Sequence, residues 1–154
     1  MKKDVFYKSK LKKIETHYQQ NNEKKYCFIG YDVITKEEEK KIIDILDEKC
    51  DYFIISIWNN DTELFDFLVK QLSEYILQIG YIKNSVLYNS HKQIALKCRY
   101  SRYVLMHIKQ SFNSDRYFPS FHEYIDCSYY KDDLCLLTQI GENQGLYRLK
   151  NMEI

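Results

Sequence analysis

Glycine and proline are scarce in this chain, which has four glycines and one proline in 154 residues. The Rossmann and P-loop phosphate sites need closely spaced glycines, because backbone amides must converge on the phosphate oxygens. Glycines at positions 30, 80, 141 and 145 form neither pattern, so nucleotide binding by those two routes is excluded. No glycine- or proline-rich linker divides the sequence, and we predict a single domain over residues 1–154.

Long hydrophobic runs are also absent from the sequence. The longest, Tyr52 to Trp58, is interrupted by Ser56 and is far shorter than the roughly 20 residues of a membrane-spanning helix. The first residues are charged and lack the apolar segment of a signal peptide. The five cysteines include no C-x-x-C pair, a usage typical of reduced thiols. We therefore expect a cytoplasmic chain with no membrane partner.

Recognisable catalytic and metal-binding patterns are missing as well. Cys98 and His107 are the least unfavourable thiol and imidazole for nucleophilic catalysis, but the predicted helix places Cys98 on its core stripe and His107 away from it. Zinc sites usually need two closely spaced pairs of Cys or His, which this sequence lacks. His122-Glu123 is not followed by a second histidine at zinc-protease spacing. We predict no catalytic residue, no metal site and no cofactor, and expect a non-enzyme more than an enzyme.

Charge is distributed unevenly, although the net charge is only +1. Residues 1–25 carry eight Lys and Arg against three Asp and Glu, and residues 26–80 carry five against twelve. Residues 81–116 carry seven against one, and residues 117–154 carry three against six. Two interpretations stay open: the segments neutralise each other within the fold, or the basic segment forms a separate face for an acidic partner.

The hydrophobic pattern of residues 26–58 predicts a strand, a helix and a second strand. The nearly continuous apolar run 26–34 is typical of a strand covered on both faces. Thr35 and Glu38 have the spacing of a capping box ahead of a helix over 36–49. The β-branched and aromatic run 52–58 indicates a central strand, and this order favours a parallel crossover.

Flanking segments add further helices and a strand to this prediction. Residues 1–24 indicate a loosely packed basic helix. A second amphipathic pattern predicts a helix from an Asn60 cap to Ile79, with Gly80 as its left-handed C-cap. A third strand is expected over residues 82–88.

A long helix over residues 90–112 and a C-terminal hairpin complete the prediction. Ser90 would cap the helix, whose apolar side chains fall within one arc at 100° per residue. Residues 134–140 and 146–150 flank a loop that contains two glycines, which indicates a hairpin. We therefore predict an α/β class: a single-domain mixed sheet with a parallel β-α-β-α-β start, a long third helix and an antiparallel C-terminal hairpin.

The carboxyl ends of the first two predicted strands form one candidate pocket, because ligands of open parallel sheets bind there. Two carboxylates from neighbouring strand ends could hold Mg²⁺ or share acid and base roles. Helix capping and turn formation explain the same residues without a ligand. The candidate pocket residues are Asp32, Thr35, Trp58, Asn59, Asn60 and Asp61.

Arginine and tyrosine are interleaved over residues 99–130, and these side chains dominate interface energetics. The face of the predicted long helix opposite its core stripe mixes basic and apolar groups, which a purely solvated face would not need. It is either covered by the C-terminal strands or meets a partner. The candidate partner-binding residues are Lys92, Leu96, Arg99, Arg102, Tyr103, Met106, Arg116 and Tyr117.

These observations favour a small cytoplasmic protein-binding module, a stoichiometric inhibitor or immunity-type protein that occludes a toxin or nuclease through an acidic patch on that partner. A module for single-stranded nucleic acid, using the basic and tyrosine-bearing residues 92–117, is the first alternative. A Mg²⁺-dependent enzyme with carboxylates at the strand ends is the second.

Overall fold

A computed structural model describes residues 11–15, 26–57, 61–84, 89–118, 122, 124–132, 134–140 and 145–150 of the chain. Its strands are β1 (Lys12–Lys13), β2 (Tyr26–Gly30), β3 (Tyr52–Ile57), β4 (Ile76–Asn84), β5 (Asn89–Arg99), β6 (Ile125–Lys131), β7 (Leu134–Ile140) and β8 (Gly145–Leu149). Its α-helices are α2 (Lys36–Lys49), α3 (Thr62–Gln71) and α4 (Arg102–Ser111), and a 3-10 turn, η2, covers Tyr31–Val33.

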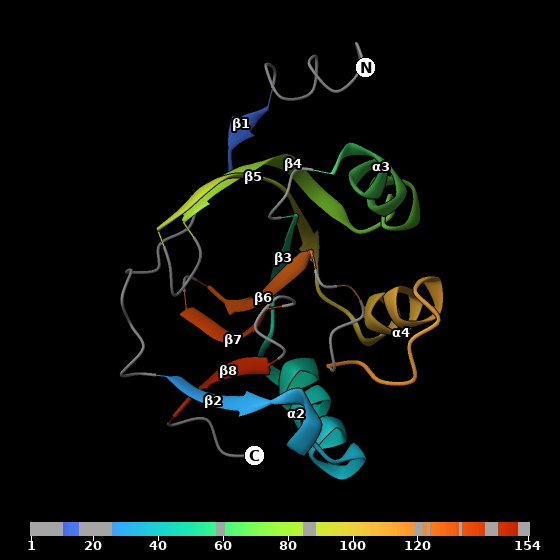
Figure 1. Ribbon diagram of the computed structural model, residues 1–154, viewed down its shortest axis with the longest axis vertical. Coiled ribbons are helices and arrows are strands. Elements are labelled where there is room, and N and C mark those ends of the chain that lie inside the picture. Colours follow the sequence, from blue (N-terminus) through green and yellow to red (C-terminus); the bar gives the residue numbers. More distant parts are fainter. Residues whose placement is uncertain are drawn as a thin grey trace.

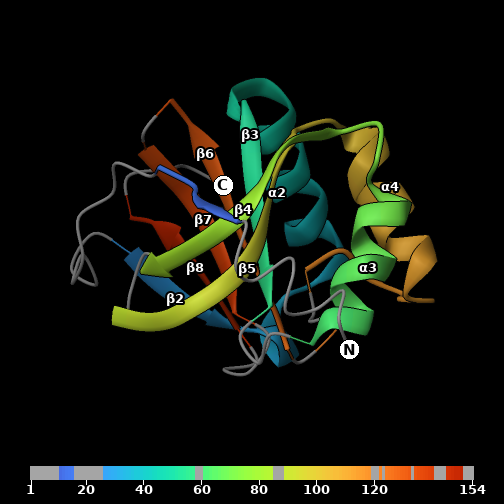
Figure 2. The ribbon, with the colours of Figure 1, turned by 90° about the horizontal axis from the view of Figure 1, so that it is seen from above.

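The described strands form one sheet in the order β1-β4-β5-β3-β6-β7-β8-β2. The pair β1 and β4 is parallel, and the other described pairs are antiparallel. Figure 1 and Figure 2 both show the helices on one side of this curved sheet. The prediction of a mixed α/β fold is confirmed, as is the antiparallel pair β7 and β8 at its C-terminal end.

The helix predicted over 36–49 is confirmed as α2. The Glu38 amide donates to Thr35 Oγ1 at 3.1 Å, and the Thr35 hydroxyl donates to a Glu38 carboxylate oxygen at the same distance. Both bonds satisfy polar groups at the helix start, as the capping-box spacing predicts. None of the described helices is long and apolar enough to cross a membrane.

The predicted parallel β-α-β start needs correction in its pairing. Strands β2, β3 and β4 do run in the same direction, but none of the three pairs with another. Strand β5 separates β3 from β4, and three strands separate β3 from β2. Antiparallel neighbours from later in the chain insert between them, an outcome that local hydrophobic patterns do not encode.

The helix predicted up to Ile79 is too long. Helix α3 is capped by the Asp61 carboxylate, which accepts from the Leu64 amide at 3.1 Å, and it ends at Gln71. The following residues turn and enter β4, so the strand predicted over 82–88 begins instead at Ile76. Leu77, Ile79 and Tyr81 alternate with smaller or polar residues. This period of two is a strand signal, which the prediction of a helix up to Ile79 did not take into account.

Gly80 lies inside β4 and is not a helix cap. A methyl group there would overlap the carbonyl oxygen of Lys12 and lie 2.9 Å from Ile14 Cγ1. Strand β1 pairs with β4 at this point, with Lys12 opposite Gly80, and the Ile14 amide donates to the Tyr81 carbonyl oxygen at 2.8 Å. Glycine is therefore required by the close approach of two backbones.

Replacing Gly80 by alanine is expected to lower the free energy of unfolding by about 1 to 3 kcal/mol, because the added methyl group pushes β1 from its neighbour. Urea unfolding measures the loss, and faster exchange of the Ile14 amide hydrogen locates it. Gly30→Ala is the matched control, since a methyl group there meets mainly a carboxylate oxygen of Asp32, at 2.8 Å, on a side chain that can rotate. Equal effects of the two variants would contradict this account.

The helix predicted over 90–112 is wrong in its first half, where the chain forms β5 and pairs with both β3 and β4. Ile94, Leu96 and Cys98 alternate along the strand and are buried. Ser101, not Ser90, is the N-cap of the helix, and its hydroxyl accepts from the Val104 amide at 3.3 Å. Residues 11–15 likewise contain β1 where a basic helix was predicted, and the rest of 1–24 lies outside the described residues.

Aromatic rings fill the core between the sheet and the helices. Tyr129 of β6 is 1% exposed, and its ring centroid lies 5.8 Å from Phe53, 6.1 Å from Phe118 and 6.4 Å from Tyr100. These four rings come from β3, from β6 and from the segments on either side of α4. The cluster therefore fixes α4 against the sheet.

Candidate interaction surface around helix α4

Helix α4 is amphipathic, and its two sides differ sharply in exposure. Val104, Leu105 and Ile108 are buried against the core. On the opposite arc Tyr103 is 74% exposed and Met106 is 38% exposed. We call this arc, together with its flanking side chains, the α4 surface; it comprises Arg102, Tyr103, Met106, His107, Lys109 and Gln110.

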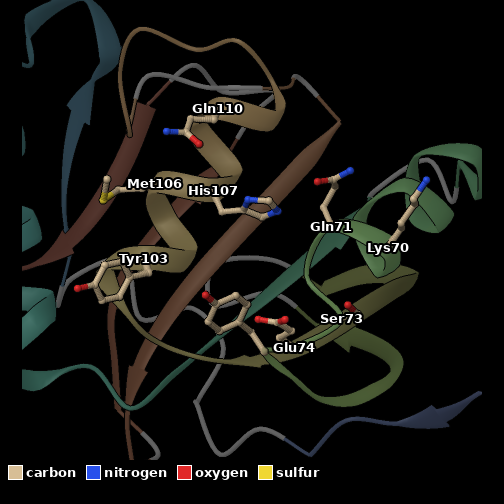
Figure 3. A pocket seen from close by; sticks show the side chains of 9 residues that line it. Lys70, Gln71, Ser73, Glu74, Tyr103, Met106, His107 and Gln110 are labelled. Carbon is tan, nitrogen blue, oxygen red and sulfur yellow. The ribbon is translucent and has the colours of Figure 1, made fainter.

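A groove with a volume of about 530 Å³ lies between the α4 surface and α3. It is lined by Lys70, Gln71, Ser73, Glu74, Tyr75, Tyr103, Met106, His107 and Gln110. Figure 3 shows the His107 ring pointing from α4 toward α3, where Gln71 and Lys70 project. The volume falls within the range of about 300–1,000 Å³ usual for ligand sites.

Two contacts hold α3 and α4 together beside this groove. The Ser111 hydroxyl donates to Gln71 Oε1 at 3.3 Å, and the rings of Phe67 and Phe112 meet edge to face with centroids 5.4 Å apart. One wall is α4 and the other is the end of α3 with the turn that follows it, and because these segments contact each other, the groove is a preformed feature of the fold.

A second, smaller pocket of about 170 Å³ lies beside Arg102, the first residue of α4. It is lined by Lys36, Glu39, Lys40, Ile43, Arg102 and Tyr117. Ile43 is 6% exposed and contributes an apolar wall. The two pockets together bring Arg102, Tyr103, Met106 and Tyr117, four of the predicted partner-binding residues, around one helix.

Glu39, which lines the smaller pocket, forms an ion pair with Arg116. The Glu39 side chain is 7% exposed and accepts from Arg116 Nε at 3.0 Å and from the Tyr117 amide at 2.9 Å. Arg116 also donates through Nη2 to the Ile34 carbonyl oxygen. Arg116, predicted to contact a partner, is therefore a structural residue that ties the segment after α4 to the start of α2.

Arg102 also has partners within the chain. Its Nη2 lies 2.6 Å from Asp44 Oδ1 and 2.5 Å from Asp47 Oδ2, both on α2. The Tyr100 hydroxyl donates to Asp47 Oδ1 at 2.8 Å, and burial is the main cause that raises the pKa of this phenol. These contacts and the Glu39–Arg116 pair show that the acidic segment 26–80 and the basic segment 81–116 neutralise each other in part, the first of the two interpretations of the charge pattern.

The remaining predicted partner-binding residues do not lie on one face with Tyr103, as the helix 90–112 required. Leu96 is 1% exposed and belongs to the core. Lys92 is exposed on β5, but seven residues of extended chain, about 23 Å, separate it from Arg99. Arg99 is exposed. It also lies near the groove, because its guanidinium carbon is 5.5 Å from the ring centroid of Tyr75, which lines the groove.

Four basic residues of the segment 92–117 form cation–π contacts within the chain. Lys92 lies over Tyr81, Lys97 over Tyr52, Arg99 over Tyr75 and Lys109 over Tyr117, at 4.1, 4.3, 5.5 and 4.7 Å from the ring centroids. Such contacts are worth about 0.5 to 1 kcal/mol at exposed sites. The pattern that suggested a partner thus has an intramolecular role at these four positions.

The predicted strand-end pocket does not form a joint site among the described residues. Asp32 follows the edge strand β2, whereas Asp61 follows the central strand β3, and β6, β7 and β8 lie between those strands. Thr35 and Asp61 cap α2 and α3, which is the interpretation without a ligand. Trp58, Asn59 and Asn60 lie outside the described residues.

All five cysteines are free thiols, and four of them, Cys50, Cys98, Cys127 and Cys135, lie in environments that disfavour a thiolate. Burial raises the pKa of Cys98 and of Cys50 to about 12, and it raises the pKa of Cys127 as well. A thiol with such a pKa is a poor nucleophile at neutral pH. Cys98 is fully buried in β5, so the pair with His107 is not supported, and the described residues contain no metal-binding cluster.

Sequence reasoning missed the walls that α2 and α3 contribute to the two pockets. The prediction of one helix up to Ile79 placed Ser73, Glu74 and Tyr75 within a helix, and the alternation that begins at Leu77 was the signal against it. Lys36 and Lys40 lie outside the apolar stripe of α2, but no local pattern indicates that Tyr117 lies beside them.

Comparison with protein-family models, with curated proteins and with solved structures finds no match to this chain.

Proposed function

We propose that this chain is a protein-binding module whose α4 surface docks on a partner protein that presents carboxylates, and that it acts as a stoichiometric inhibitor of that partner, of the immunity type. The single observation that carries the proposal is the exposure of Tyr103 and Met106 beside a preformed groove. Large, flexible or aromatic side chains next to a recess are the usual anchors of protein interfaces.

Charge supports the acidic nature of the partner. Lys36, Lys40 and Lys70 line the two pockets, and Arg99 stands next to the groove. Of the carboxylates that line them, Glu39 is already engaged by Arg116, which leaves Glu74 as the remaining acidic lining residue. A surface with this excess of cations favours encounter with a negatively charged protein.

The free thiols support a reducing compartment, and we place the module in the cytoplasm as part of the same proposal. The contacts of the pocket residues support binding over catalysis, because the described residues Ser73, Glu74 and His107 line the same groove but no hydrogen bond joins their side chains.

A photo-crosslinking amino acid at position 103 tests the proposal in cells. We expect one discrete protein adduct with 1:1 stoichiometry, identified by mass spectrometry. The same amino acid at Phe28, a half-exposed aromatic residue on the edge strand β2, is the matched control and should give none. With the identified partner purified, Tyr103→Ala should weaken binding by about 30-fold, the hot-spot magnitude of about 2 kcal/mol, while Phe28→Ala changes it less than about twofold.

Equal adducts from the two positions would show that the α4 surface has no special role. Binding unchanged by Tyr103→Ala in a folded variant would have the same meaning. Recovery of RNA or DNA in place of protein from position 103, with salt-sensitive binding of a labelled oligonucleotide, would overturn the proposal in favour of the nucleic-acid alternative.

A further inference from the structure

We infer that the smaller pocket is the receptor for one acidic side chain of the partner, an aspartate or glutamate carboxylate held by Lys36 and Lys40. This inference rests on the proposed function and names the residues that a carboxylate of the partner contacts. The pocket, at about 170 Å³, is smaller than the roughly 300 Å³ at which small-molecule sites begin. A single side chain suits it better than a cofactor or nucleotide.

The two lysines are placed to act together. They are four residues apart on α2, so their side chains project from the same face of the helix, and both are exposed. Neither forms an ion pair with a described residue, whereas the neighbouring Lys41 lies 3.9 Å from Glu37. Two ammonium groups beside one recess form a binding site for a single anion.

The acidic residues around the pocket are already engaged within the chain. Glu39 accepts from Arg116 and from the Tyr117 amide, Glu38 accepts from Thr35, and Glu37 pairs with Lys41. Asp44 and Asp47 hold Arg102 in the wall of the pocket. Glu38 bonds only a neutral hydroxyl and keeps its charge, but none of these described carboxylates forms an ion pair with Lys36 or Lys40, whose ammonium groups are therefore left for an incoming carboxylate.

The shape of the pocket also suits a side chain with an apolar stem. Ile43 supplies a buried aliphatic wall, and Tyr117 supplies an aromatic one. Lys109 lies over the Tyr117 ring at 4.7 Å from its centroid, which places a further cation next to that residue. The methylene groups of a glutamate can pack on Ile43 and Tyr117 while its carboxylate reaches the lysines.

Titration of the full chain with hexaglutamate, followed by NMR of the backbone amides, tests this inference. We expect shifts concentrated at Lys36 to Ile43 and at Tyr117, and at least tenfold weaker binding by Lys36→Gln/Lys40→Gln. The matched control is Lys41→Gln/Lys49→Gln, which removes the same charge from the same helix outside the pocket and should change affinity less than twofold. Lys36→Arg/Lys40→Arg should retain binding. The unfolding midpoint of each variant checks that the substitutions preserve the fold.

Three outcomes would overturn the inference: unchanged binding by a folded Lys36→Gln/Lys40→Gln variant, equal loss in the control variant, or tighter binding of inorganic phosphate than of hexaglutamate at the same amides. The last result would assign the pocket to phosphate. If hexaglutamate fails while the adduct at position 103 persists, the pocket assignment falls and the proposed function stands. If hexaglutamate binds and position 103 gives no adduct, the proposed function falls.

Discussion

Replacing Glu39 by alanine is expected to lower the free energy of unfolding by about 3 kcal/mol, the low end of the cost of breaking a buried ion pair. The variant leaves the Arg116 guanidinium without its carboxylate and the Tyr117 amide without its acceptor. We take the low end because the Arg116 side chain retains 23% exposure and can be partly solvated. Urea unfolding followed by circular dichroism measures the change.

Glu37→Ala is the control for Glu39→Ala, because it removes another carboxylate from the same first turn of α2. Glu37 is 83% exposed and lies 3.9 Å from Lys41, so its loss should cost less than about 1 kcal/mol. The double variant Glu39→Ala/Arg116→Ala should be less destabilised than the sum of the single variants, since it leaves no unpaired charge. A cost of Glu39→Ala below about 0.5 kcal/mol would refute the structural role of this pair.

Replacing Tyr129 by alanine is expected to lower the free energy of unfolding by about 4 kcal/mol, within the range for large-to-small changes of aromatic core residues. Tyr129 is 1% exposed and touches the rings of Phe53, Tyr100 and Phe118. Removing it leaves a cavity between the sheet and the segments that flank α4. Calorimetric or urea unfolding would measure the loss, and near-ultraviolet circular dichroism would report the loosened ring cluster.

Tyr129→Phe keeps the ring and separates packing from the hydroxyl group. It should cost less than about 1.5 kcal/mol at pH 7, since the volume is nearly conserved. Burial is the main cause that raises the pKa of the Tyr129 phenol above its ordinary value of 10.0. The unfolded chain therefore loses this proton first, so the phenol's contribution is fully present below about pH 10 and is lost as the pH rises further. Tyr129→Phe should consequently flatten the alkaline fall in stability, and an unchanged fall would argue against the buried phenol.

Elements whose signals are local could be predicted from the residues themselves. Helix α2 follows from the Thr35 and Glu38 capping box and an apolar stripe, and β3 follows from a dense β-branched and aromatic run. The β7 and β8 pair follows from two apolar segments around a short loop. In α2 and in the β7 and β8 pair, backbone hydrogen bonds close between near neighbours, so nearby side chains suffice to select the conformation. Strand β3 pairs with the distant strands β5 and β6, and its local signal is only the β-branched and aromatic run.

The candidate site depended on contacts between distant residues. Residues 89–99 satisfy a helical stripe and a strand alternation equally well, and pairing with β3 and β4 decides for the strand because it buries Ile94, Leu96 and Cys98 and completes hydrogen bonds on both edges. Helix α4 consequently begins at Arg102, and its exposed arc lies between walls from α3 and α2. The Glu39–Arg116 pair joins residues 77 positions apart, and such a contact exists only once the chain has folded.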